Sequence, residues 1–254
     1  MGKIVAVANQ KGGVGKTTTS VNLSASLMTL GYRVLLVDLD AQGNATMGCG
    51  VDKHQLGDSA YEVLTGKAFV GDAIVNVDPE GLDLLPGNSD LTAVQVELMS
   101  RIGRERVLSE ALAVCRDDYH FVVIDCPPAL NILTLNALVA ADSILIPMQC
   151  EYYALEGLSD LMGTMENVRD MINPDLHVEG LLRTMHDTRS RLAAEVSSQL
   201  LQHFGGQVFD TIVPRNVRLA EAPSHGLSIV KYDRGSKGAQ AYLALAEEII
   251  RRNQ

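Results

Sequence analysis

Gln10-Lys11-Gly12-Gly13-Val14-Gly15-Lys16-Thr17-Thr18 is the stretch that decides the fold of this 254-residue chain. It follows an apolar run at residues 4–8, which is typical of a buried parallel strand. It precedes residues 19–30, where apolar side chains recur at helical spacing. A strand, a glycine-rich loop and a helix N-terminus in this order form an arrangement that cradles phosphate groups. The stretch therefore predicts a nucleotide-binding loop.

The residue types of the loop indicate how it holds a nucleotide. Its three glycines have no Cβ, so backbone N–H groups can close around an anion. Lys16 is predicted to reach the β- and γ-phosphates, and the hydroxyl of Thr17 is predicted to bind Mg²⁺. The nucleotide-binding residues predicted within the loop are Gly12, Gly13, Val14, Gly15, Lys16, Thr17 and Thr18.

Acidic residues stand at the ends of two other strongly apolar runs. Residues 33–37 lead into Asp38 and Asp40, and residues 121–124 lead into Asp125. We expect Asp125 to hold Mg²⁺ through a water, because a phosphate-binding loop lies upstream. Asp38 and Asp40 are two residues apart in an extended segment, so we expect them to share one face and to serve the metal and the attacking water. An alternative interpretation is that these two acids cap the helix that follows.

Apolar runs and helical periodicity alternate along the chain. Strands are predicted at residues 4–8, 33–37, 82–85, 121–125, 143–147, 178–182 and 208–213. Helices are predicted at residues 19–30, 90–98, 104–114, 131–141, 155–172, 192–204 and 238–252. The pattern is weak between residues 51 and 81, where a helical turn at residues 61–64 stands out. The alternation predicts an α/β fold in one domain, residues 1–254, with a doubly wound, mostly parallel sheet and helices on both faces.

Composition narrows the class of protein. Hydrophobic residues make up 46% of the chain and charged residues 20%, as in ordinary soluble globular proteins. No apolar run approaches the ~18 residues that a membrane-spanning helix needs, and the start of the chain lacks the pattern of a signal peptide. The four cysteines show no C-x-x-C spacing, which argues against a zinc site or a disulfide framework. We therefore expect a cytoplasmic protein with reduced thiols.

The loop departs from the usual phosphate-loop pattern at two positions. Gln10 stands where the first glycine is expected, and a second lysine, Lys11, directly precedes the glycine pair. With this departure the loop resembles the deviant Walker A motif of the ParA/MinD superfamily of P-loop ATPases, and most closely the short chromosomal ParA (Soj) proteins. The resemblance continues through residues 37–44, 124–128, 151–157 and 214–218. It implies a P-loop NTPase fold and a slow, partner-stimulated hydrolysis of ATP to ADP and phosphate with Mg²⁺.

The resemblance also implies which residues are catalytic. In this family the lysine that matches Lys11 reaches across an ATP-bound sandwich homodimer to the partner's nucleotide, where it acts as an arginine finger does. Asp40 matches the residue that orients the attacking water, and Lys16 supplies positive charge from within one chain. A solvated loop lysine is the alternative interpretation for Lys11. On the family's pattern, turnover depends on dimerisation.

Two further pairs of residues receive roles from the resemblance. Pro214 and Asn216 match residues that contact adenine, and Arg189 and Arg218 match arginines used for non-specific binding of duplex DNA. The net charge of −10 argues against nucleic-acid binding. However, the net charge is −13 up to residue 180 and +3 beyond it. A basic face in the C-terminal third is therefore compatible with contacts to DNA phosphates.

The implied function is that of a ParA-type ATPase in chromosome or plasmid partitioning. The ATP-bound dimer coats nucleoid DNA, and a ParB-type protein bound at centromere-like sites stimulates hydrolysis and releases it. The alternatives are a MinD-like membrane-associated ATPase, a cargo-positioning ParA relative and a relative that holds an iron–sulfur cluster between subunits. Membrane association is not expected, because residues 246–254 lack the large apolar face of a lipid-binding helix. An iron–sulfur cluster requires more closely spaced cysteines than this chain has. The sequence does not distinguish a chromosome-partitioning protein from a cargo-positioning relative.

Overall fold

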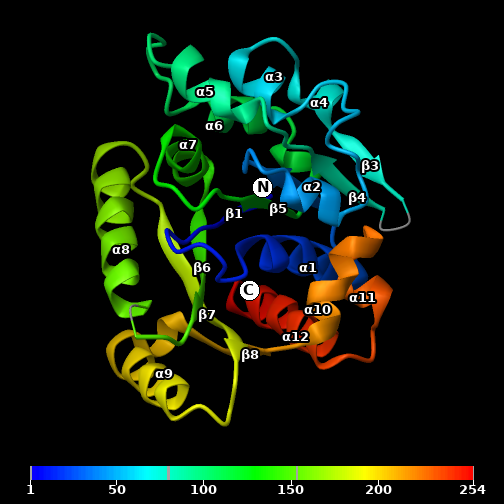
Figure 1. The fold of residues 1–254 in the computed structure, drawn as a ribbon. Helices are drawn as coiled ribbons and strands as arrows, with labels where there is room; N and C mark the ends of the chain where they lie inside the picture. The colour runs from blue at the N-terminus through cyan, green and yellow to red at the C-terminus, as the bar shows by residue number, and fades with distance from the viewer. Residues whose placement is uncertain (1, 79–80, 153, 254) are drawn as a thin grey trace.

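An eight-stranded sheet forms the centre of the molecule, in the order β3-β4-β2-β5-β1-β6-β7-β8 (Figure 1). The strands are β1 Lys3–Val7, β2 Val34–Asp38, β3 Val75–Val77, β4 Leu82–Leu85, β5 Phe121–Asp125, β6 Ser143–Gln149, β7 His177–His186 and β8 Val208–Pro214. Neighbouring strands are parallel except β3 and β4, which are antiparallel. The structure, a computed structural model, describes residues 2–78, 81–152 and 154–253, so Met1, Tyr153 and Gln254 of the predicted domain and motif lie outside it. The predicted mostly parallel, doubly wound sheet is confirmed.

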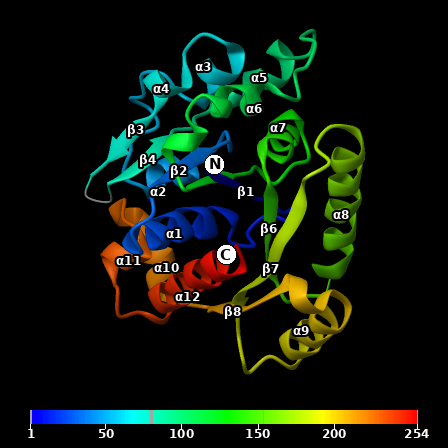
Figure 2. The same ribbon diagram turned by 180° about the vertical axis from the view of Figure 1, so that it is seen from behind.

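Helices cover both faces of this sheet (Figures 1 and 2). One face packs against α3 Ala60–Thr65, α4 Val70–Ala73, α5 Leu91–Glu97, α6 Val107–Ala113, α7 Ile132–Ala140, α8 Ala154–Met171 and α9 Arg191–Phe204. The other face packs against α1 Lys16–Thr29, α2 Asn44–Gly48, α10 Val217–Glu221, α11 Ile229–Tyr232 and α12 Lys237–Arg252. Short 3₁₀ helices in the connections are η1 Arg116–Asp118, η2 Gly205–Gln207 and η3 Ala222–His225. Among the helices of the described residues, none is long and apolar enough to cross a membrane.

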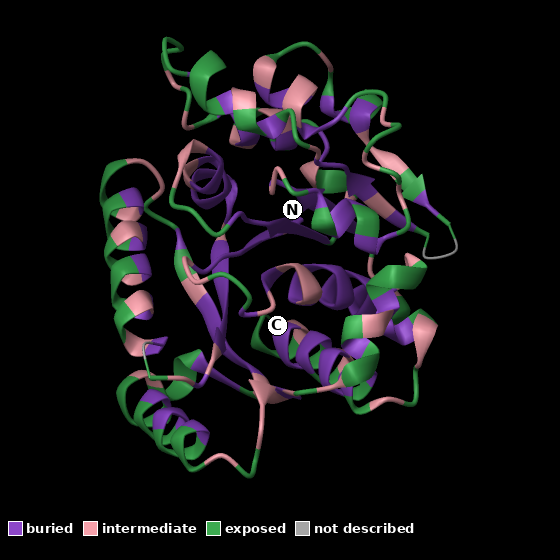
Figure 3. Ribbon diagram, viewed as in Figure 1, coloured by how far each residue is buried: buried purple, intermediate pink, exposed green. Residues whose placement is uncertain are grey.

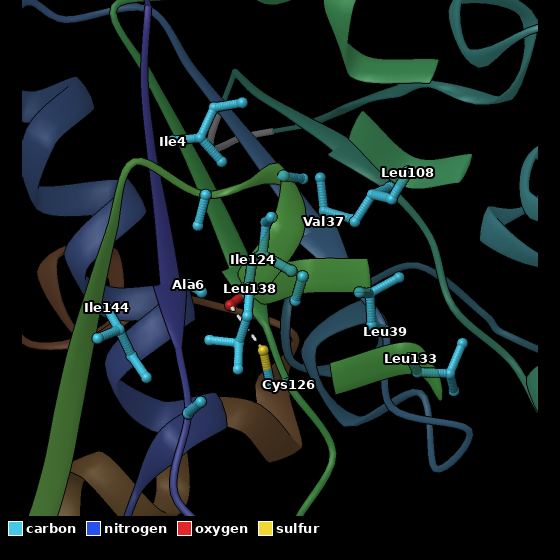
Figure 4. Packing of buried hydrophobic residues seen from close by; sticks show 14 of the residues in the cluster. Ile4, Ala6, Val37, Leu39, Leu108, Ile124, Cys126, Leu133, Leu138 and Ile144 are labelled. Carbon is cyan, nitrogen blue, oxygen red and sulfur yellow. Dashed lines mark hydrogen bonds between the residues drawn. The ribbon is translucent and has the colours of Figure 1, made fainter. Parts of the chain in front are cut away.

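Alternating residues of the central strands supply two separate hydrophobic cores. In β1, Ile4 and Ala6 belong to the core on the α7 side, whereas Val5 and Val7 belong to the core on the α1 side. The central strands are buried along their length (Figure 3), and Leu138 of α7 lies over the first of these cores (Figure 4). A strand that is buried on both sides has a continuous apolar sequence, which explains why these strands were predictable.

The carboxyl ends of the parallel strands meet at one edge of the sheet, and the phosphate loop emerges near the middle of that edge. β1 lies between β5 and β6, so the loop after β1 has the ends of both neighbours beside it. The opposite edge carries the two ends of the described chain. There the ammonium of Lys3 contacts both Glu179 and the side chain of Asn253.

Two parts of the fold differ from the expectation. β3 lies in the region with weak sequence signals and is an edge strand of three residues, of which Val77 alone is buried. α3, in the same region, is fixed by a capping box: Ser59 caps its N-terminus and donates its own N–H to the Glu62 carboxylate at 2.9 Å.

β7 continues to His186, several residues beyond its predicted end. This extension brings additional side chains to the carboxyl edge of the sheet.

Candidate active site

The phosphate loop connects β1 to the N-terminus of α1. Gly13 and Gly15 adopt left-handed backbone conformations, with φ of 72° and 89°, which favour glycine. Gly15 is the N-cap of α1, and no side chain caps the helix, so the first-turn N–H groups remain directed out of its end. A Cβ at Gly12 or Gly13 would meet no atom within 4 Å. The loop is therefore open to a phosphate-sized anion.

Lys16 begins α1 and is almost completely buried. Its Nζ donates to the carbonyl oxygen of Lys11 at 3.2 Å. Burial lowers the pKa of Lys16, and the nearby Asp125, Cys126 and Asp40 oppose this shift. The ammonium of Lys16 therefore has the acidic groups of Asp40 and Asp125 near it on the protein side and the open phosphate loop on its other side.

Asp125 ends β5 and is fully buried. Its Oδ2 accepts a hydrogen bond from Thr17 Oγ1, and its Oδ1 accepts one from Ser20 Oγ, both at 2.8 Å. Burial raises the pKa of Asp125 to about 8, and the carboxylate of Asp38, its register partner on β2, adds to the shift. A nearby cation would favour the charged carboxylate, and a hydroxyl beside a carboxylate is a donor set that Mg²⁺ prefers. The residues present therefore fit Mg²⁺.

Asp38 and Asp40 differ in their burial and in their contacts. Asp38 is fully buried, and its Oδ2 accepts hydrogen bonds from the N–H and the Oγ1 of Thr46 in α2, both at 2.8 Å. Burial raises the pKa of Asp38 to about 6. Asp40 lies two residues beyond Asp38, past the end of β2, and it lines the cavity. Asp38 thus accepts hydrogen bonds from the first turn of α2, which agrees with the alternative interpretation that it caps this helix. Asp40 instead lies at the cavity.

Lys11 is held by its own chain at the mouth of the loop. Its Nζ forms an ion pair with Glu151 Oε2 at 2.6 Å, and the two side chains are 39% and 44% exposed. Its backbone N–H donates to Asn9 Oδ1 at 2.9 Å, and Asn9 Nδ2 donates to the Pro147 carbonyl oxygen at 2.8 Å. The sequence did not predict this ion pair, which joins residues far apart in the chain.

A cavity of about 700 Å³ extends from the phosphate loop to the end of β8. Six predicted nucleotide-binding residues of the loop and α1 line one end, namely Gly12, Gly13, Gly15, Lys16, Thr17 and Thr18. Pro214 and Asn216 line the other end. Asn216 Oδ1 accepts the N–H of Leu219 at 3.3 Å and so caps α10, a contact that does not use its amide nitrogen. The structure brings both predicted base-binding residues and all predicted loop residues except Lys11 and Val14 to one cavity.

The two predicted DNA-binding arginines are exposed and lie in ion pairs. Arg189 follows β7, and its Nε and Nη2 contact the two carboxylate oxygens of Asp187 at 3.0 and 2.9 Å. Arg218 in α10 contacts Glu221 at 2.8 Å through Nη1 and Asp233 at 3.5 Å through Nε. β7 and β8 are neighbours, so both arginines follow the carboxyl ends of adjacent strands. Neither arginine lines the cavity.

Further residues of the site were not evident from the sequence. Thr184 Oγ1 donates to the carbonyl oxygen of Val14 at 2.7 Å and ties β7 to the phosphate loop. Met185 lines the cavity with φ of 47°, a conformation that is uncommon for residues other than glycine. Arg215 is exposed and lines the same cavity. The signal that would have identified the first two is the full length of β7.

The last helix of the chain also reaches the cavity. Tyr242 of α12 is fully buried, and its hydroxyl lies 3.1 Å from Thr19 Oγ1 on α1. The Tyr242 side chain lines the same cavity as the phosphate loop. The site is therefore built from both ends of the chain.

Together, the glycine loop before α1, the contact of Thr17 with Asp125 and the parallel sheet define a P-loop nucleoside triphosphatase. Residues 2–178 match the sequence model of a family described as an AAA domain. The chain is 51% identical over 251 residues to the chromosome-partitioning ATPase Soj of Thermus thermophilus, covering 98% of this chain and 96% of the relative. It is 47% identical over 254 residues to the chromosome partitioning protein ParA of Caulobacter vibrioides, covering 99% and 95%. The chain belongs to the Soj/ParA family of ATPases, as its sequence motifs predicted.

A solved structure extends this comparison to the ligands. Cobyrinic acid a,c-diamide synthase from Mycobacterium smegmatis, with bound ADP and magnesium, superposes with a TM-score of 0.87 at 40% identity. The superposition covers 99% of this chain and 95% of that one. The prediction of ATP or ADP with Mg²⁺ agrees with the ligands of this homologous structure.

Proposed function

We propose that this protein is a cytoplasmic, nucleoid-associated partitioning ATPase whose whole chain, residues 1–254, acts as one domain. The observation that carries the proposal is the 2.8 Å hydrogen bond from Thr17 Oγ1 to Asp125 Oδ2, with Lys16 beside it. The loop that precedes these residues also holds a second lysine, Lys11. The first three residues form a triphosphate and Mg²⁺ site, and the second lysine is the feature shared with the ParA/MinD superfamily. The relatives named above are chromosome partitioning proteins, which favours a chromosome over a plasmid or another cargo.

In this proposal ATP spans the cavity. Its phosphates lie against the open loop and the N-terminus of α1, and Lys16 donates to the β- and γ-phosphates. The adenine lies against Pro214, and the amide of Asn216 reads its edge. The cavity volume of about 700 Å³ is within the usual range for sites of such ligands.

Thr17 and Asp125, the latter through a water, hold Mg²⁺, which offsets phosphate charge when it is bound. Within residues 2–78, 81–152 and 154–253, no group of three or more His, Cys, Asp or Glu side chains is arranged to hold a metal by itself. Phosphate oxygens and waters therefore complete the coordination. Asp38 contributes charge rather than a direct ligand, because both of its oxygens accept hydrogen bonds from Asp40 and Thr46.

Hydrolysis in this proposal divides between two subunits. Asp40, at the cavity wall, orients the water that attacks the γ-phosphate, and Lys16 stabilises the developing charge from the same chain. Lys11 supplies positive charge to the nucleotide of the partner in an ATP-bound homodimer. Turnover is slow until a ParB-type protein bound to DNA stimulates it.

Duplex DNA is the proposed surface on which the dimer acts. Each subunit presents Arg189 and Arg218, so a dimer doubles the number of phosphate contacts and gains from their effective concentration. Binding is independent of sequence because such contacts are made to the backbone. Because Arg189 pairs with Asp187 and Arg218 pairs with Glu221, a single subunit presents less positive charge to DNA.

The structure gives no support to the membrane-associated alternative. The apolar face of α12 is buried, with Leu245 and Ile249 in the core next to α1, so this helix has no free face for lipid. The iron–sulfur alternative also lacks support, since all four cysteines are buried. A thiolate that bridges two subunits needs to reach the surface between them.

Asp40→Ala tests the proposed function. We expect ATP binding to be retained and hydrolysis to fall by about 100-fold, because the attacking water loses its oriented acceptor. ATP-bound dimer should then accumulate in size-exclusion chromatography with ATP and Mg²⁺. Asp52→Ala is the matched control, since Asp52 is exposed and does not line the cavity. Phosphate release at the normal rate from Asp40→Ala would exclude this role, and the absence of an ATP-dependent dimer would exclude the two-subunit mechanism.

A further inference from the structure

Three contacts fix Lys11 within its own subunit. Its N–H is held by Asn9, its carbonyl oxygen accepts from Lys16 Nζ, and its ammonium pairs with Glu151. Glu151 is itself fixed, because its N–H donates to the Gln149 carbonyl oxygen at 2.8 Å and its carbonyl oxygen accepts from Ala154 at 3.0 Å. The carboxylate thus extends from the segment that follows β6 toward the phosphate loop, where it meets the Lys11 ammonium.

Two of the three contacts oppose the trans role of Lys11. An ammonium that is 2.6 Å from Glu151 is not available to the nucleotide of a second subunit. The carbonyl contact links the two lysines of the loop, so a shift of Lys16 Nζ toward phosphate would loosen its contact with the Lys11 carbonyl oxygen. The contact with Asn9 needs no change, because it holds the backbone and leaves the side chain free to swing.

We propose that Glu151 is a positioning residue that holds Lys11 in cis and competes with the partner's ATP for its ammonium. This inference rests on the proposed sandwich dimer and adds a control to it. Binding of ATP in cis releases the carbonyl contact first, and formation of the dimer then exchanges the Glu151 carboxylate for phosphate oxygens. The backbone contact with Asn9 serves as the pivot. The ion pair therefore disfavours dimers until nucleotide is bound.

The expected size of the effect follows from the exposure of the pair. One partly exposed ion pair changes an equilibrium constant by about 1.4- to 5-fold. Two such pairs open in each dimer, so their removal should tighten the dimer dissociation constant by about 2- to 30-fold. The difference should be largest at low salt and small near 1 M salt, where the Debye length is only about 3 Å.

The test compares Glu151→Gln with Glu156→Gln in the Asp40→Ala background, where ATP is expected to be consumed only slowly. Glu156 is an exposed acid on the first turn of α8, so its variant removes the same charge nearby without breaking the pair. Analytical ultracentrifugation with ATP and Mg²⁺ measures the dimer constant across a salt series. Mass spectrometry after acylation by an N-hydroxysuccinimide ester measures the accessibility of the Lys11 amine in the nucleotide-free protein.

We expect Glu151→Gln to tighten the dimer, to increase acylation of Lys11 and to leave monomer affinity for ADP unchanged. Glu156→Gln should match the parent in all three measurements. In a Lys11→Ala background, Glu151→Gln should have no effect on the dimer. An unchanged or weaker dimer in Glu151→Gln, or an equal tightening in Glu156→Gln, would overturn this inference alone. If no variant forms an ATP-dependent dimer, the proposed function itself fails, together with the competition that depends on it.

Discussion

Asp125, Thr17 and Ser20 form hydrogen bonds in the interior, whereas Lys11, Arg189 and Arg218 form ion pairs at the surface. We call Lys16, Thr17, Ser20 and Asp125 the buried cluster, and Lys11, Arg189 and Arg218 the exposed cations. Within the buried cluster, Thr17 and Ser20 donate hydrogen bonds to Asp125, and Lys16 interacts electrostatically with Asp125. The exposed cations each contact an acid of their own chain instead.

The difference between these two groups indicates what each requires. Burial raises the pKa of Asp125 to about 8, so a cation beside it would favour the charged carboxylate. The exposed cations are already neutralised by Glu151, Asp187 and Glu221. Exposed pairs contribute little free energy and exchange readily for stronger anionic partners. The first group therefore suits a ligand within one chain, and the second suits macromolecular partners.

Lys11→Ala should produce the largest effect and separate the two groups. Partner-stimulated hydrolysis should fall by about 1,000-fold or more, as when an arginine finger is removed. Nucleotide affinity of the monomer should be retained, because the buried cluster is intact. Phosphate release with the ParB-type partner present, together with calorimetry using ADP, measures both properties. Normal stimulated turnover would make Lys11 a solvated surface lysine.

Arg189→Glu combined with Arg218→Glu should abolish ATP-dependent DNA binding. A dimer loses four phosphate contacts, each worth about 0.9 in the slope of log affinity against log salt, so affinity near 0.1 M salt should fall by about 1,000-fold or more. ATP-dependent dimerisation should persist, since neither arginine lines the cavity. Fluorescence anisotropy with random duplex DNA across a salt series measures the change. The same slope in the double variant would place the DNA contact elsewhere.

Asp187→Asn tests the same DNA contact, with an expected change in affinity in the opposite direction. Hydrogen bonds and charge from Arg189 lower the pKa of Asp187 to about 2, so the acid stays ionised and paired throughout the neutral range. Its removal should strengthen DNA binding by freeing Arg189. A weaker complex would show that the pair orients the arginine rather than withholding it.

Lys16→Ala should weaken ATP binding by about 100-fold, because hydrogen bonds to charged groups contribute the most among such contacts. Calorimetric titration with ATP and Mg²⁺ measures the affinity. Lys231→Ala is the control, since Lys231 is exposed and does not line the cavity. Wild-type affinity in Lys16→Ala would remove the phosphate-loop assignment.

Asp125→Asn should change how stability depends on pH. The pKa of Asp125 is about 8 in the folded protein and near 3.8 when unfolded, so the folded state binds the proton more tightly. Wild-type free energy of unfolding should therefore fall relative to the variant as pH rises from about 5 to 8, by at most about 1.4 kcal/mol per pH unit. Denaturant unfolding without metal or nucleotide, at several pH values, measures the difference. Parallel pH profiles would contradict the raised pKa.

The sequence predicted the buried parts of the molecule best. β1, β2 and β5 are buried on both faces, so their sequences are continuously apolar and easily recognised. The phosphate loop and Asp125 were found because they follow such strands. β3 was missed, because a three-residue edge strand has too little buried surface to leave a pattern.

Contacts between residues far apart in the chain were not predictable from spacing. The pair of Lys11 with Glu151 depends on how β6 and α8 meet, and the contact of Thr184 with Val14 depends on the length of β7. The sequence did not show that Asp38 is fully buried against Thr46 whereas Asp40 lines the cavity, because both contacts depend on where α2 packs. Local periodicity carries no information about such tertiary geometry.

The contact between Tyr242 and Thr19 has a consequence for biosynthesis. Translation produces the phosphate loop first and α12 last, yet α12 supplies the side chain beneath that loop. A nascent chain on the ribosome therefore carries Lys16 and Asp125 long before the cavity has its floor, and the inner face of α1 stays uncovered until then. The cavity therefore takes the form described here only after α12 has left the ribosome and packed against α1.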